Sequence, residues 1–70
     1  MKININTAKA ADLEKLTGVG PAIAARIIEY REQNGPFKKT SDITRVKGIG
    51  EKTFEKFSDS ITVGEPQPEE

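Results

Sequence analysis

The chain has 70 residues, enough for one small domain, and it contains neither cysteine nor histidine. Disulfides, thiolate or imidazole metal sites and the usual acid–base groups are therefore excluded, and nothing else in the sequence indicates an enzyme. The formal net charge is zero, but residues 64–70 hold three of the eleven acids and no base, so residues 1–63 carry a net +3. We expect a mildly basic domain at 1–63 and a disordered acidic tail at 64–70.

The first part of the chain predicts an extended segment followed by a helix. Residues 3–6 (Ile-Asn-Ile-Asn) alternate in polarity, as an extended segment does. Asn6 or Thr7 is expected to cap a helix over about 8–16, because a short polar side chain there accepts a free N–H. A glycine turn at 17–20 then reverses the chain.

The clearest predicted element is a helix over about 21–33, whose apolar residues follow helical spacing. Pro21 suits its first position because that residue needs no N–H donor. Residues 34–36 (Asn-Gly-Pro) end it, since glycine accepts a left-handed cap and proline cannot continue a helix. Phe37 is expected to enter the core beside Tyr30.

The second part of the chain predicts two shorter helices around another glycine turn. Thr40 or Ser41 is expected to cap a helix over about 41–47. The turn leads into a helix over about 51–60, and residues 61–63 are expected to run back toward the extended segment at the start of the chain.

A shift of thirty residues superposes the two parts. The pairs that keep their chemical character through helix, turn and helix are Asp12 with Asp42, Leu13 with Ile43, Leu16 with Val46, Gly18 with Gly48, Val19 with Ile49, Gly20 with Gly50, Ala24 with Phe54 and Ile27 with Phe57. Each unit is too small to bury its own apolar face, so the two are expected to pack as a pseudo-twofold pair. That arrangement would place both glycine turns on one side of the domain.

Each glycine turn has features that are typical of a phosphate-binding site. Two glycines around one aliphatic residue permit a positive φ and leave the peptide N–H groups open to a ligand. The turn then enters a helix whose first N–H groups lack partners and carry partial positive charge. Anions bind such helix starts, and a phosphate is the most common one. The alternative is that the glycines serve only to turn the chain between antiparallel helices.

Leu-Thr-Gly-Val-Gly-Pro at 16–21 and Val-Lys-Gly-Ile-Gly-Glu-Lys at 46–52 resemble two helix-hairpin-helix motifs, the non-sequence-specific DNA-binding element of many repair and recombination proteins. With Ile-Asn-Ile-Asn-Thr-Ala at 3–8, Ile-Ile-Glu-Tyr-Arg at 27–31 and Asn-Gly-Pro-Phe at 34–37, the chain is similar to the DNA-binding domain of the ComEA competence family over residues 3–63. The resemblance implies an all-α fold of two tandem motifs in one pseudo-twofold domain, like SAM domains and the second domain of RuvA. It also implies binding of double-stranded DNA during uptake for natural transformation.

The same resemblance places the DNA-phosphate contacts on the two hairpin backbones. The implied residues are Gly18, Val19, Gly20 and Ala22 in the first motif, and Gly48, Ile49, Gly50 and Lys52 in the second. Lys47 and Lys52 bracket the second turn and are expected to contact phosphate as well, the alternative being a solvated helix face. Pro21 has no N–H to give, and Ile23 is apolar where many relatives have a lysine, so we expect the first motif to bind more weakly.

Several matters stay open at this point. Arg26, Arg31, Lys38 and Lys39 are either further phosphate contacts or ordinary exposed bases. Phe54 stands where the motif usually has a small alanine, which would move its helix outward.

The alternative function is a protein–protein interaction module without DNA binding, the use that this fold has in an extrinsic subunit of photosystem II. No cofactor or metal is expected beyond a structural monovalent cation that hairpin carbonyls of the wider family can hold. The expected partners are double-stranded DNA and other DNA-uptake proteins, with no membrane insertion by this segment. The expected location is the periplasm or another extracytoplasmic face if a leader or anchor was removed, and the cytoplasm otherwise.

Overall fold

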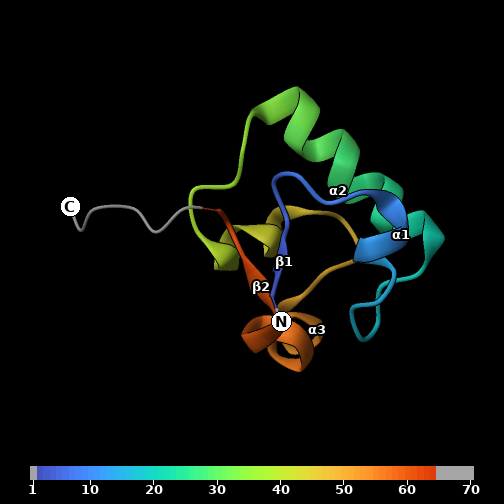
Figure 1. Ribbon diagram of the computed structural model, residues 1–70. Helices are drawn as coiled ribbons and strands as arrows, with labels where there is room; N and C mark the ends of the chain where they lie inside the picture. The colour runs from blue at the N-terminus through green and yellow to red at the C-terminus, as the bar shows by residue number, and fades with distance from the viewer. Residues whose placement is uncertain (1, 65–70) are drawn as a thin grey trace.

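Five short helical segments and one pair of very short strands make up residues 2–64, the part of the chain that the computed structural model describes (Figure 1). In chain order they are β1 (Ile3–Asn4), α1 (Ala10–Leu13), α2 (Pro21–Asn34), the 3-10 helix η1 (Thr40–Arg45), α3 (Glu51–Phe57), the 3-10 helix η2 (Ser58–Ser60) and β2 (Ile61–Thr62). The predicted all-α class is confirmed, with the strand pair as a small addition. All but the first residue of the predicted tail at 64–70 lies outside the described residues.

The helices that precede the two hairpins are shorter and tighter than the sequence predicts. The predicted helix over 8–16 is a single α turn, after which Leu16 N–H donates to Leu13 O at 3.0 Å. The predicted helix over 41–47 is the 3-10 helix η1, which ends at Arg45. Bonds between residues three apart tighten the backbone, which shortens the approach to each hairpin.

The predicted helix caps are wrong, because other residues stand at the helix starts. Lys9 precedes α1 and Lys39 precedes η1, and neither makes a side-chain capping bond. Asn6 instead joins distant segments. Its Nδ2 donates to Phe37 O at 3.0 Å and to Val63 O at 3.1 Å, while its Oδ1 accepts from Phe37 N at 2.7 Å.

Helix α2 is the longest element and matches its prediction closely. Ala24 and Ile27 on its inner face are fully buried, and Gly35 ends it with φ +88°. Phe37 is buried and stacks on Tyr30 with ring centroids 5.3 Å apart, so that prediction is confirmed. The other long prediction is partly wrong, since α3 ends at Phe57 and continues to residue 60 only as η2.

The two ends of the described chain pair with each other. β1 and β2 lie side by side in parallel near the middle of the molecule in Figure 1, with Ile3 opposite Ile61 and Asn4 opposite Thr62. Ile5 N–H extends the pairing by donating to Thr62 O at 2.9 Å. The prediction that residues 61–63 return to the starting segment is therefore confirmed, and Ile5 and Ile61 join the core.

Both repeats contribute equivalent residues to one core. The buried pairs related by the thirty-residue shift are Leu13 and Ile43, Leu16 and Val46, Val19 and Ile49, and Ile27 and Phe57. The pair Ala24 and Phe54 departs from this rule, because Ala24 is fully buried while Phe54 is half-buried against Phe57 in an edge-on contact. The core holds no buried polar side chain among residues 2–64, so its stability rests on apolar packing.

Candidate nucleic-acid interface

Two hairpins with the same backbone hydrogen bonds form the candidate interface: hairpin 1, residues 16–20, and hairpin 2, residues 46–50. Val19 N–H donates to Leu16 O and Ile49 N–H donates to Val46 O, both at 3.0 Å. The first bonds of the following helices match too, since Ala24 N–H donates to Gly20 O and Phe54 N–H to Gly50 O, both at 2.9 Å. The internal repeat seen in the sequence is thus a repeat of structure.

The glycines of each hairpin take two different conformations. Gly18 has φ +87° and Gly48 φ +102°, a region that side chains disfavour. Gly20 and Gly50 have φ of −99° and −95°, which any residue can adopt, and a methyl group built on either would meet no atom within 4 Å. The first glycine of each motif is therefore required by the turn, whereas the second keeps the approach to the backbone open.

Each hairpin packs against the second helix of the opposite repeat. A methyl group built on Gly18 would lie 3.2 Å from Thr53 Cγ2, and one built on Gly48 would lie 3.3 Å from Ile23 Cγ1. Ile23 and Thr53 are themselves related by the thirty-residue shift, so the two contacts are reciprocal. The hairpins consequently sit close together across the pseudo-twofold axis, toward the right of Figure 1.

The backbone N–H groups around the hairpins divide into two sets. The N–H groups of Val19 and Ile49 donate to carbonyl oxygens within the turns, and the side chains of these two residues are buried. Within the described residues no acceptor pairs with the remaining N–H groups of the hairpin glycines or of the first helical turns. In hairpin 1 these belong to Gly18, Gly20, Ala22 and Ile23, and in hairpin 2 to Gly48, Gly50, Glu51, Lys52 and Thr53. Val19 and Ile49 therefore shape the turns, and the unpaired N–H groups are the candidate phosphate donors.

Basic side chains gather at hairpin 2. Lys47 and Lys52 are exposed on either side of the turn, while the equivalent residues at hairpin 1 are Thr17 and Ala22. Arg26, from the first repeat, donates from Nη1 to Lys47 O at 3.4 Å, and this nitrogen lies 3.4 Å from a methyl group built on Gly48. Arg26 thus belongs to the opposite hairpin, a placement that depends on the packing of the repeats and leaves no local signal in the sequence.

Arg31 does not join these bases. Its Nη1 donates to Ile5 O at 2.9 Å and its Nη2 to Ala8 O at 2.7 Å, so the guanidinium fixes the start of the chain against α2. Lys38 and Lys39 are exposed beyond the end of α2. Of the bases left open by the sequence, Arg31 therefore serves the packing of the fold, whereas Arg26 lies at hairpin 2.

Residues 2–64 contain no cluster of side chains that could ligate a metal ion. No group of three or more carboxylates there is placed to hold a metal ion, and no helix is long and apolar enough to cross a bilayer. A hollow of about 470 Å³ lies between β1 and α1 and is lined by no residue of either hairpin, and the ion pair of Lys15 with Asp12 (3.6 Å) forms part of its wall. The monovalent cation on the hairpin carbonyls stays a prediction.

Comparison with known proteins shows what this chain is similar to. A family described as the helix-hairpin-helix motif matches residues 1–62. Over 61 residues the chain is 57% identical to ComE operon protein 1 of Bacillus subtilis, covering 87% of this chain and 30% of that protein. It is 46% identical to an uncharacterized protein of Haemophilus influenzae, covering 86% of this chain and 54% of that one.

A more distant similarity reaches animal proteins. The chain is 44% identical over 62 residues to the human endonuclease/exonuclease/phosphatase family domain-containing protein 1, covering 89% of this chain but 11% of that protein. The chain thus spans between a tenth and about half of these relatives.

Proposed function

Since this chain belongs to the helix-hairpin-helix family, in the form found in ComEA proteins, we propose that it binds double-stranded DNA during uptake for natural transformation. The observation that carries the proposal is the pair of neighbouring hairpins whose glycine and helix-start N–H groups have no acceptor within residues 2–64. A duplex presents phosphates on two strands, and two adjacent hairpins match them across the minor groove. Lys47 and Lys52 add positive charge at hairpin 2.

This mode of binding reads phosphates and not bases. Main-chain N–H groups and lysines contact the DNA backbone, so sequence preference should be slight. With about three to five phosphates neutralised, log Kd should rise with log salt concentration with a slope of about 2.7 to 4.5. The isolated domain should bind at micromolar concentrations or more weakly, and other DNA-uptake proteins are proposed partners.

We place this activity on an extracytoplasmic face, on the strength of the similarity to ComE operon protein 1. We propose no catalytic role, because the hairpins supply donors to an anion and no metal-ligating group of carboxylates lies among residues 2–64. The animal relative carries an enzyme name, but the matched segment is only 11% of that protein.

Gly50→Ser tests the proposal sharply, because it separates binding from stability. A serine at this N-cap has free space and an allowed φ, and its Oγ would accept the N–H of Lys52 or Thr53. Glycine and serine caps differ by only a few tenths of a kcal/mol, so the melting temperature should change little. The affinity for duplex DNA should fall roughly tenfold, because the serine side chain occupies one of these N–H groups and leaves a phosphate less room to approach the hairpin backbone.

Lysine variants supply the second arm of the experiment. Lys47→Gln and Lys52→Gln should each lower the salt slope by about 0.9, equally on duplexes of different sequence. Lys39→Gln makes the same charge change away from the hairpins and should leave the slope in place. Full duplex binding by Gly50→Ser would remove the hairpin from the mechanism, and no duplex binding by the parent domain at low salt would favour the protein-interaction alternative.

A further inference from the structure

A groove runs from hairpin 2 along the side of α2, between that helix and η1. Two adjoining hollows form it, of about 300 Å³ and about 230 Å³, and both are lined by Tyr30, Asn34 and Arg45. Arg26 and Lys47 line the end at hairpin 2, and Lys38 lines the far end. We call this feature the α2–η1 groove.

We propose that one strand of the bound duplex continues from hairpin 2 into the α2–η1 groove, where Arg45 holds a further phosphate. This inference rests on the proposed function and extends it, because it lengthens the contact with one DNA strand. Each hairpin holds one strand, whereas the groove adds contacts to the strand at hairpin 2 alone.

The charge of the groove suits a phosphodiester chain. Its bases are Arg26, Lys38, Arg45 and Lys47, and its acids are Glu29 and Asp42. Glu29 Oε2 already accepts a hydrogen bond from Gln33 Nε2 at 3.3 Å. The bases outnumber the acids along the whole path, so an anionic strand is favoured over a cationic or apolar occupant.

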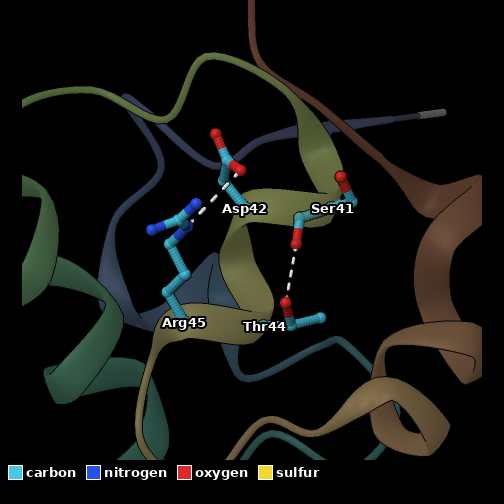
Figure 2. A network of polar contacts seen from close by, with 4 residues as sticks. All are labelled: Ser41, Asp42, Thr44 and Arg45. Carbon is cyan, nitrogen blue, oxygen red and sulfur yellow. Dashed lines mark hydrogen bonds and ion pairs between the residues drawn. The ribbon is translucent and has the colours of Figure 1, made fainter.

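The Arg45 side chain is exposed and lies beside Asp42, which leaves its guanidinium able to bind a phosphate. Its Nε lies 3.7 Å from Asp42 Oδ1, and its side chain is 70% exposed. Figure 2 shows the Arg45 guanidinium and Asp42 together on one side of η1, while the Thr44 hydroxyl and Ser41 O are linked on the other side. A guanidinium has five N–H donors, so the terminal nitrogens of Arg45 keep donors for a phosphate while Nε faces Asp42.

The groove belongs to one repeat because α2 is longer than α3. Tyr30 and Asn34 form its wall from the last turns of a fourteen-residue helix. The equivalent positions in the second repeat are 60 and 64, which lie beyond the seven-residue α3. At 1.5 Å per residue, the wall from Arg26 to Asn34 extends about 12 Å, the rise of about three to four base pairs.

The length of the duplex tests this inference. The full chain is titrated with two DNA stem-loops, whose stems have about 6 and 14 base pairs. On each stem, the Kd of the variant is divided by the Kd of the parent. This ratio cancels the larger number of positions at which the domain can bind along the longer stem. Arg45→Gln should raise Kd about three- to tenfold on the long stem and lower its salt slope by about 0.9, with little change on the short stem. Lys39→Gln, an equal charge change outside the groove, should leave both ratios near one.

Asp42→Asn separates the phosphate contact from the stability of η1. It removes the ion pair but keeps Arg45, so binding to the long stem should stay level or become tighter. Equal ratios on both stems for Arg45→Gln, or an equal loss with Asp42→Asn, would overturn the role of the groove. If the parent chain binds neither stem, the proposed function fails instead, which is a distinguishable result.

Discussion

Asn6 shows how much of this small fold can depend on one side chain. Its amide joins the starting segment to Phe37 and Val63, 31 and 57 residues away. The sequence predicts Asn6 or Thr7 as a helix cap, because short polar residues commonly take that role, and the true partners of Asn6 are remote in the chain. The role of Arg31 could not be predicted for the same reason, because its acceptors are the carbonyl oxygens of residues 5 and 8, which are also remote in the chain.

Asn6→Ala should therefore destabilise the domain far more than an average surface change. Each hydrogen bond contributes about 1 kcal/mol net, so losing three should cost about 2–3 kcal/mol. For a domain of this size that corresponds to a fall in melting temperature of roughly 10 °C or more, measured by circular dichroism.

Asn34→Ala is the matched control, because Asn34 makes one exposed bond from Nδ2 to Tyr30 O at 3.2 Å. If the melting temperature falls no further in Asn6→Ala than in this control, the Asn6 hydrogen bonds add little to stability.

At the scale of elements, the sequence predicted the order of helices and turns, the length of α2 and the repeat. It did so because apolar spacing, glycine pairs and proline are local signals. The 3-10 character of η1 and the shortness of α1 were missed, since both depend on how tightly the chain must turn before a hairpin. The placement of Arg26 and Arg45 was also beyond prediction, because one depends on packing between repeats and the other on the length of α2.

The two hairpins should not contribute equally to binding. Gly20→Ser and Gly50→Ser are equivalent changes, both at an N-cap with open space. Hairpin 1 has one N–H fewer because of Pro21 and has no lysine at positions 17 and 22. We expect the Gly20→Ser change to raise Kd by about threefold, less than the roughly tenfold effect of Gly50→Ser.

Fluorescence anisotropy on one 14-base-pair stem, with both variants and the parent in the same buffer, measures this difference. If Gly20→Ser raised Kd more than Gly50→Ser, the stronger phosphate contact would lie at hairpin 1. That result would contradict the role of Lys47 and Lys52 as phosphate contacts.

At the scale of the molecule, the core is shared between the two repeats, whereas the charge is not shared evenly along the chain. The four buried pairs related by the thirty-residue shift each draw one residue from either repeat, so the two repeats bury their apolar faces together. The charge, by contrast, is divided by sequence position, with a net +3 up to residue 63 and three acids after it.

Removal of residues 65–70 should therefore tighten DNA binding. The net charge would rise from zero to +3, which lowers long-range repulsion from the phosphates. The affinity should increase a few-fold near 50 mM salt, and the gain should shrink at 300 mM, where the Debye length is only about 6 Å. Titration at the two salt concentrations measures the effect, and a gain that is independent of salt would exclude an electrostatic origin.

The parallel pairing of β1 with β2 has a mechanical consequence. The chain enters the strand pair at one end and leaves it at the other, so tension between the two termini slides the strands along each other. The ladder bonds, including that from Ile5 to Thr62, then share the force and break together, whereas an antiparallel pair pulled from one end opens bond by bond. A domain that is pulled by both ends of its chain would therefore resist the force through the bonds that join residues 3–5 to residues 61–62.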